Sequence, residues 1–262
     1  MLIDKSRSKM ASKMDMDWID IFDFADEAIM LLHCAPIFFM PAPDAKPSAI
    51  CANATVALLD TGLKKVMVTC CHVWEEFLNF RVSTPTACLC TVFVSGWGQP
   101  IVISDEALID SDAGIDLVVL QASPEAWNMG YKEFYRIERW PIPKARVDDP
   151  IAFIGFPGGG RHTSDRVGNF TYSAFGLSVS DVSERKLLIA GKSNDKRGLF
   201  DNHGNRIPAI LMGGLSGSPA YVRDGKARFL LTGFVQMGRT SSDDIFLTHA
   251  SFLNSDGTLK HL

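Results

Sequence analysis

The chain lacks any concentration of charge of one sign. Of its 262 residues, 26 are Lys or Arg and 30 are Asp or Glu, and the basic residues are scattered along the sequence. Proteins that bind nucleic acid or other polyanions present clustered basic surfaces. The sequence therefore predicts no nucleic-acid partner, while its 47% apolar residues suffice for the cores of a globular protein.

A long hydrophobic run is also missing near the start. The first 16 residues are polar, and the apolar residues that follow are interrupted by four acids, Asp20, Asp23, Asp26 and Glu27. No secretory hydrophobic region or membrane span fits this pattern, so we expect a cytoplasmic protein that does not bind membranes. Apolar residues between Asp15 and Leu32 recur at near-helical spacing, which predicts an amphipathic helix and a helical extension over residues 1–28.

Cysteine is absent beyond residue 90. The six cysteines lie mostly in apolar, β-prone segments, which predicts buried, reduced thiols: Cys34, Cys51, Cys70, Cys71, Cys88 and Cys90. Cys88 and Cys90 would share one face of a strand and resemble half of a metal site. No second pair of ligands lies at zinc spacing, so we expect neither a metal nor another cofactor.

Short β-prone runs separated by turns dominate the rest of the chain. Many short strands predict an all-β sandwich or barrel. The segment Trp140–Lys144 carries two prolines, which interrupt a strand ladder, and is the best candidate for a linker. We therefore divide the remainder into residues 29–135 and 136–262. The expected strands are 55–59, 66–70, 87–94, 101–103, 117–120, 151–156, 170–175, 186–190, 219–222 and 229–235.

Three short segments carry residues suited to nucleophilic catalysis. Ser216 lies in the glycine-rich stretch 213–219, His72 ends an apolar strand, and Asp116 precedes another. Each has a structural alternative: a serine in an ordinary loop, a histidine capping a strand or a short helix at 74–77, and an acid in a turn. The order His, Asp, Ser, with 44 and then 100 residues between them, differs from the order in α/β-hydrolases and in subtilisins.

With these three segments in this order and at this spacing, residues 29–250 resemble the trypsin-like (chymotrypsin-fold) serine peptidases, and especially their disulfide-free, HtrA-like bacterial branch. The resemblance implies two antiparallel six-stranded β-barrels with a cleft between them. It also implies that Ser216 is the nucleophile, His72 its general base, and Asp116 the acid that orients the imidazole. The backbone N–H groups of Gly214 and Ser216 would form the oxyanion hole.

One position departs from the secreted digestive relatives. They carry an aspartate before the nucleophile, which pairs with a newly cut N-terminus, whereas this chain has Leu215. We therefore expect an enzyme that needs no cleavage of its own N-terminus, or one whose loop is ordered by a ligand or partner.

The resemblance also suggests where a protein or peptide substrate binds. The pocket wall would come from residues before the nucleophile and from one strand end, and the backbone of the strand end would pair with the substrate. Because these residues include no acid, we expect an apolar or small side chain at the cleavage position. The expected pocket residues are Ile210, Leu211, Met212, Gly213, Gln236, Met237 and Gly238.

A competing motif occupies residues 155–162, where the glycine spacing equals that of a phosphate-binding loop. Arg161 and His162 replace the required Lys and Ser or Thr, and Pro157 interrupts the loop, so we expect no nucleotide. Besides a serine endopeptidase, two functions remain open: an esterase with the same triad, and a catalytically quiet module that holds a peptide or a partner protein of a larger complex.

Overall fold

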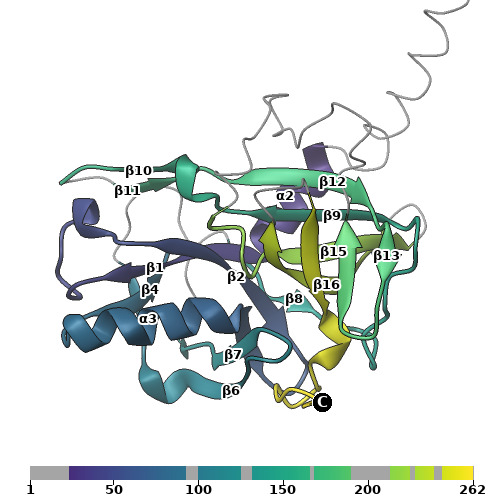
Figure 1. The fold of residues 1–262 in the computed structure, drawn as a ribbon, viewed down its shortest axis with the longest axis horizontal. Coiled ribbons are helices and arrows are strands. Elements are labelled where there is room, and N and C mark those ends of the chain that lie inside the picture. Colours follow the sequence, from purple (N-terminus) through teal and green to yellow (C-terminus); the bar gives the residue numbers. More distant parts are fainter. Residues whose placement is uncertain are drawn as a thin grey trace, which may run out of the picture.

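The computed structural model describes seven stretches of the chain and consists mainly of two antiparallel β-sheets (Figure 1). This confirms the predicted all-β class, and two curled sheets are consistent with the trypsin-like fold. None of the helices in the described stretches is long and apolar enough to cross a membrane. The stretches are residues 24–92, 100–124, 132–165, 168–189, 213–224, 228–238 and 244–261.

The first sheet has eight strands, in the order β5-β4-β1-β2-β3-β7-β6, with β8 pairing parallel to β2. A hairpin turn joins β2 to β3, and Gly62 there has a φ of 91°. The strands are β1 (Cys34–Met40), β2 (Asn53–Asp60), β3 (Lys65–Thr69), β4 (Cys88–Thr91), β5 (Ile101–Ile103), β6 (Leu108–Asp112), β7 (Leu117–Gln121) and β8 (Tyr135–Arg136).

The second sheet has seven strands, in the order β12-β9-β15-β16-β17-β14-β13. The resemblance implies six strands in each barrel. The observed numbers are larger, eight and seven, but each sheet includes one strand of only two residues. The strands are β9 (Pro150–Gly155), β12 (Ser173–Ser178), β13 (Asp181–Val182), β14 (Lys186–Ile189), β15 (Pro219–Asp224), β16 (Arg228–Gly238) and β17 (Ile245–His249). The expected linker, residues 140–144, forms no strand between β8 and β9.

A separate two-stranded hairpin, β10 (Arg161–Thr163) and β11 (Gly168–Phe170), follows β9. The single strand expected over residues 170–175 is thus divided between β11 and β12. Single-turn 3₁₀ helices occupy Pro47–Ala49 (η1), Asp105–Ala107 (η2), Gly158–Gly160 (η3) and Ala250–Phe252 (η5).

Two α-helices accompany the sheets in the described part of the chain. Helix α2 (Phe24–Leu32) contacts β9 and β1 and continues past residue 28, the expected end of the N-terminal extension; the rest of the predicted helix lies outside the described residues. Helix α3 (Cys71–Ser83) is longer than the predicted short helix at 74–77. Its inward side chains Val73, Trp74 and Phe77 pack in the core of the first sheet, which explains why the helix continues.

Four apolar clusters lie in the described part of the chain, and three of them form the cores that hold the two sheets and join them. One core lies within the first sheet and one within the second. The third combines residues of both, such as Leu59 and Leu117 with Ile154 and Phe234, all fully buried. Because this shared core fixes one sheet against the other, loops from both sheets keep a defined geometry where they meet.

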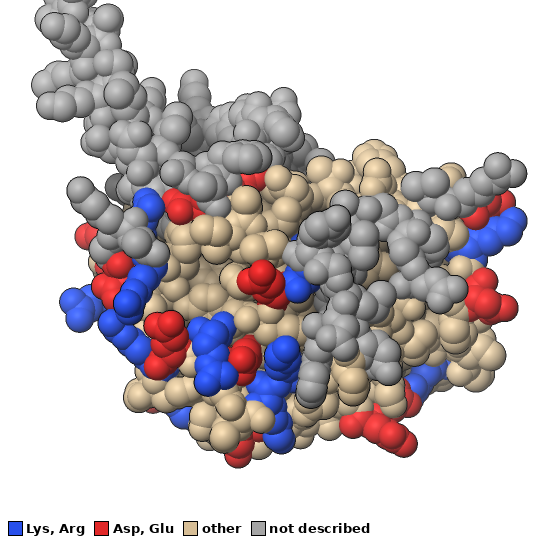
Figure 2. All heavy atoms as spheres, turned by 180° about the vertical axis from the view of Figure 1, so that it is seen from behind, with Lys and Arg blue, Asp and Glu red and all other residues tan. Residues whose placement is uncertain are grey.

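Charges of both signs are interspersed over the face shown in Figure 2, and no single-sign patch is visible there. Ion pairs between surface residues, such as Arg136 with Asp60 at 2.9 Å and Arg139 with Asp224 at 3.3 Å, account for part of this pattern.

Candidate active site

His72 lies in the first turn of α3, directly after β3. The helix begins at Cys71, and Cys70 is its N-cap residue with an extended backbone. The sequence produces this change from strand to helix because the β-branched run of β3 ends at Thr69, and helical spacing of buried residues begins after it. The imidazole is thereby held at the end of a buried strand.

Asp116 lies in the tight turn between β6 and β7. The carboxylate of Asp112 accepts hydrogen bonds from the backbone N–H groups of Gly114 (2.7 Å) and Ile115 (3.3 Å), which forms the turn. Asp116 itself has a φ of 57°, in the left-handed region that aspartate adopts more readily than most residues. This backbone conformation directs its side chain toward the start of α3.

Ser216 lies in the loop that enters β15. Gly214 and Gly217 on either side of it have φ values of 98° and 89°. A Cβ atom on Gly214 would lie 2.5 Å from the carbonyl oxygen of Phe156, and one on Gly217 would lie 2.2 Å from that of Thr55. The loop therefore requires glycine at both positions for two reasons, positive φ and close backbone contact.

Thr55 of β2 fastens this loop to the first sheet. Its N–H donates to the carbonyl oxygen of Ser216 (2.9 Å), and its hydroxyl donates to that of Gly214 (2.8 Å). The same hydroxyl accepts from the N–H of Phe156 at 2.9 Å. Leu215 is 2% exposed and packs into the core of the second sheet, so both sheets hold the serine in place.

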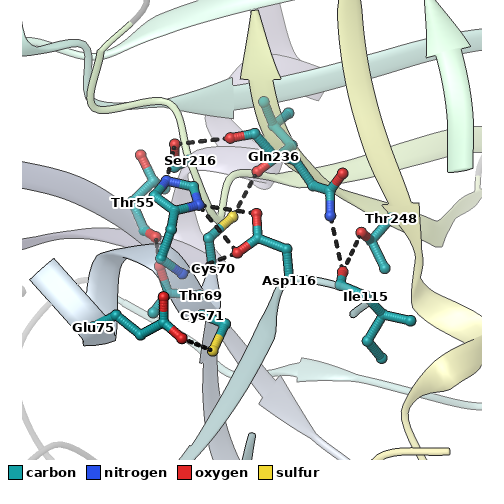
Figure 3. Close-up of polar contacts among 12 residues, drawn as sticks. Thr55, Thr69, Cys70, Cys71, Glu75, Ile115, Asp116, Ser216, Gln236 and Thr248 are labelled. Atoms are coloured by element: carbon teal, nitrogen blue, oxygen red, sulfur yellow. Dashed lines mark hydrogen bonds and ion pairs between the residues drawn. The ribbon is translucent and has the colours of Figure 1, made fainter. Parts of the chain in front are cut away.

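The structure brings the three predicted catalytic side chains together (Figure 3). The Nδ1 atom of His72 lies 2.9 and 3.0 Å from the two carboxylate oxygens of Asp116, and its Nε2 atom lies 3.1 Å from the hydroxyl of Ser216. The backbone N–H of His72 also donates to Asp116 at 2.9 Å. The Ser216 hydroxyl contacts the carbonyl oxygen of Gln236 at 2.9 Å as well.

The electrostatics of the cluster act mainly on His72. Its hydrogen bond to Asp116 raises the pKa of the imidazole above 6.5, partial burial lowers it, and the charges of Asp116, Glu76 and Glu75 raise it further. The net change is upward. The carboxylate thus favours the imidazolium, which is the form that a base takes after removing a proton from a hydroxyl.

The predicted oxyanion donors are free to act. Within the described part of the chain, the backbone N–H groups of Gly214 and Ser216 donate no hydrogen bond. The neighbouring turn is held by the N–H of Gly158, which donates to the carbonyl oxygen of Gly213, and by Asn53, whose side-chain amide donates to the carbonyl oxygen of Phe156 at 2.8 Å. Free donors beside a nucleophile are what a developing oxyanion needs.

Only part of the expected substrate pocket falls in the described residues. Ile210, Leu211 and Met212 lie outside them, and Gly213 is exposed. The backbone of Gln236 contacts Ser216, but its side chain is buried and donates to the carbonyl oxygen of Ile115 instead of facing a substrate. Met237 and Gly238 continue β16 and pair with β17.

Beyond Phe234, β16 has one unpaired side. Its ladder with β15 runs from Asp224↔Arg228 to Pro219↔Phe234, and a hydrogen bond from Val235 N–H to Ser218 follows. Within the described residues, no strand pairs with residues 236–238 on that side. Among the described residues, the backbone expected to receive a substrate strand therefore has no partner strand on that side.

One group of side chains among the described residues has metal-ligand spacing. Ligand atoms of Cys70, His72 and Asp116 lie within 4.8 Å of one another. His72 and Asp116 are already hydrogen-bonded to each other, and the Cys70 thiol donates to the carbonyl oxygen of Val235 at 3.1 Å. Burial and the nearby Asp116 raise the pKa of Cys70 well above 9.0.

The thiols follow the expected pattern except for Cys51, which was predicted to be buried. Five of the six cysteines are buried, and Cys51 is exposed. The sulfur atoms of Cys88 and Cys90 lie 3.5 Å apart, which confirms that they share one face of β4. The glycine run at 158–160 forms the 3₁₀ turn η3 before β10 rather than the start of an α-helix, so the turn lacks the helix N-terminus of a phosphate-binding loop.

Several residues at the site had no local signal in the sequence. Thr55, Gln236 and Thr248 each contact the catalytic segments from elements more than 100 residues away. A threonine or glutamine in a β-strand is common, so only the fold reveals these contacts.

No protein-family model and no curated protein matches the chain. Among solved structures, it is similar to a thermostable serine protease, AL20, from an extremophilic microorganism. That match has 10% identity and a TM-score of 0.47, and covers 83% of this chain and 90% of that one. The human heparin binding protein is also similar, at 12% identity and a TM-score of 0.48, with 84% and 87% covered.

Proposed function

We propose that this protein is a serine endopeptidase that works through His72, Asp116 and Ser216 and an acyl-enzyme intermediate. The observation that carries the proposal is the continuous set of contacts from the Asp116 carboxylate through the two nitrogens of His72 to the Ser216 hydroxyl, at 2.9 and 3.1 Å. A serine hydroxyl is a poor nucleophile near neutral pH, and an oriented imidazole within hydrogen-bonding distance is what activates it.

In the proposed first step, Ser216 Oγ attacks the substrate carbonyl carbon while its proton passes to His72 Nε2. The N–H groups of Gly214 and Ser216 stabilise the negative oxygen of the tetrahedral intermediate. His72 then donates the proton to the leaving amine as the C–N bond breaks. Water, deprotonated by His72, attacks the resulting ester and releases the acid and the free serine.

The lack of a partner strand for residues 236–238 of β16 among the described residues supports a peptide as the substrate. A peptide strand that pairs with the backbone of residues 236–238 would place a carbonyl next to Ser216, whose hydroxyl already contacts the carbonyl oxygen of Gln236. Backbone pairing requires an extended chain next to the scissile bond, which a peptide supplies and a small ester lacks.

Labelling with a fluorophosphonate probe tests the proposal. The wild-type chain is expected to be labelled, and Ser216→Ala is expected to lose labelling completely because the attacked phosphorus would be bonded to that oxygen. Ser218→Ala is a matched control: this serine lies in the same loop, is fully buried, and its hydroxyl has no hydrogen-bond partner among the described residues.

The outcomes separate the candidate functions. A wild-type chain that resists the probe is the quiet binding module and not a peptidase. A chain that reacts with the probe and hydrolyses small esters, but cuts nothing in a diverse peptide library, is an esterase. Cleavage in that library, lost in Ser216→Ala and retained in Ser218→Ala, supports the endopeptidase.

A further inference from the structure

Two side chains of the second sheet hold the backbone carbonyl that precedes Asp116. The side-chain amide of Gln236, on β16, donates to the carbonyl oxygen of Ile115 at 2.8 Å. The hydroxyl of Thr248, on β17, donates to the same oxygen at 2.6 Å. Figure 3 shows the two donors converging on it. Gln236, Thr248 and Ile115 are at most 3% exposed, so water does not compete for these bonds.

The position of this carbonyl matters because of the backbone that follows it. The peptide group that joins Ile115 to Asp116 is planar, so two hydrogen bonds to its oxygen fix the orientation of the whole plane. Asp116 then has a φ of 57°, which is less favourable for a residue with a side chain than the right-handed region. Donors on the preceding carbonyl resist rotation of that peptide plane, which would redirect the carboxylate.

A β-bulge accounts for the reach of Gln236. The register between β16 and β17 shifts between Val235 and Met237, so Gln236 has no partner residue in that ladder. Bulges re-aim side chains in this way. Thr248 instead pairs with Phe234 in regular register. The two donors therefore approach one oxygen from neighbouring strands.

Gln236 also contacts the opposite end of the catalytic group. Its backbone carbonyl accepts from the Ser216 hydroxyl at 2.9 Å, while its side chain donates to Ile115. One residue of β16 thus touches the nucleophile through its backbone and the support of the acid through its side chain. A single residue therefore sets the distance between the Ser216 hydroxyl and the Ile115 carbonyl that precedes Asp116.

We propose that Gln236 and Thr248 are positioning residues, which hold the Asp116 carboxylate in line with His72 by fixing the Ile115 carbonyl across the boundary between the two sheets. The proposal rests on the proposed function, because it assigns these residues a part in the same triad. Neither side chain contacts the reacting atoms. Their side chains act on the triad through Asp116, while the backbone carbonyl of Gln236 contacts Ser216 separately.

The test uses the full chain and two independent readouts. The pKa of His72, followed by NMR titration of the imidazole, reports how well Asp116 is placed, whether or not the protein is an enzyme. The rate of fluorophosphonate labelling reports the reactivity of Ser216. The other charged groups that face His72 are Glu75 and Glu76 on its own helix, and they are unchanged in every variant.

Thr248→Val removes the hydroxyl at nearly constant volume, and Gln236→Met removes the amide while leaving the backbone carbonyl. In each variant we expect a lower pKa for His72. We also expect labelling to slow by a factor of about 10–10², as for other small misplacements of catalytic groups. Thr248→Ser, which restores a hydroxyl, is expected to recover most of both. The double variant is expected to lose less than the product of the two single losses, because both donors hold one oxygen.

Thr232→Val is the matched control. Thr232 is also fully buried on β16, and its hydroxyl contacts the carbonyl oxygen of Pro143 at 3.3 Å, away from the acid. A loss of stability without a change in the His72 titration is expected there. If the pKa of His72 and the labelling rate of Ser216 are the same in Thr248→Val and Gln236→Met as in Thr232→Val, then Gln236 and Thr248 are structural only and the proposal is wrong.

Failure of the proposed function gives a different result. A wild-type chain that is not labelled overturns the peptidase, whereas the His72 titration still decides whether the two donors position Asp116. If Thr248→Val does not fold, Gln236→Met decides the question, since it keeps the Thr248 hydroxyl and loses only the Gln236 amide; Thr248→Ser, which keeps both donors, is then the control.

Discussion

Gly214→Ala is the substitution that most directly tests how the nucleophile loop is built. Its Cβ atom would lie 2.5 Å from the carbonyl oxygen of Phe156, 2.7 Å from the N–H nitrogen of Gly158 and 2.8 Å from the amide nitrogen of Asn53. Two of these three atoms belong to the backbone, so the loop itself must move. The φ of 98° adds a cost of about 1–2 kcal/mol for any residue with a Cβ atom.

The expected loss of reactivity at Ser216 is larger than the backbone strain at Gly214 alone would cause. A loop that shifts to relieve these contacts moves the N–H groups of Gly214 and Ser216 away from the oxyanion. Losing one such donor costs about 10²–10³ in rate, or roughly 3–4 kcal/mol. We therefore expect Gly214→Ala to slow fluorophosphonate labelling by at least that factor while the core packing of Leu215, 2% exposed, keeps the chain folded.

Gly213→Ala is the control that the chain itself supplies. It introduces the same methyl group one residue earlier, where no described atom lies within 4 Å of the new Cβ and φ is not positive. Second-order labelling constants and melting temperatures of both variants, measured side by side, separate a local effect from a general one. Equal labelling of Gly214→Ala and Gly213→Ala would refute the oxyanion role assigned to this loop.

Three further results are expected. Asp116→Asn removes the largest cause that raises the pKa of His72, so the acid limb of the pH–rate profile should move to lower pH while the rate falls by about 10⁴; a limb that moves upward would contradict this. Removing residues 1–23 should leave labelling unchanged, because buried Leu215 holds the loop by apolar packing, whereas a gain on trimming would indicate activation by cleavage. Titration of the folded chain with a thiol reagent should find one accessible thiol, at Cys51, and none in Cys51→Ser. Because burial raises the pKa of this thiol, the reaction should be faster at pH 9 than at pH 7, and a count above one would show that a buried cysteine opens.

Most strands and the three candidate catalytic segments were predictable because their signals are local, although β1 (Cys34–Met40) and β6 (Leu108–Asp112) were not among the expected strands. An alternating or continuous apolar run of about five residues identifies a strand wherever it pairs, and the glycines around Ser216 predict a special backbone without reference to any partner. The structure confirms this at Gly214 and Gly217, which both have positive φ. Periodicity alone also suggested helix near Trp74, although not its extent.

What the sequence could not provide are contacts between distant segments. Helix α3 continues to Ser83 because Val73, Trp74 and Phe77 find a core made by strands from elsewhere in the first sheet. The split between β11 and β12 likewise depends on which strands are available to pair, since β11 pairs with β10 and β12 with β9. Tertiary context decides such boundaries, and no local pattern contains it.

The residues that hold the site in place could not be predicted either, because their contacts join distant segments of the chain. In each case, residues of one sheet hold a loop that belongs to the other sheet. The serine loop enters the second sheet, yet Thr55 of the first sheet fastens it through two hydrogen bonds. The acid turn belongs to the first sheet, yet Gln236 and Thr248 of the second sheet fasten the carbonyl before it. Each sheet therefore anchors the catalytic residue that the other one carries. Because a relative shift of the sheets would strain both sets of bonds at once, the distance between His72 and Ser216 depends on the packing between the sheets as much as on the loops that carry the two residues.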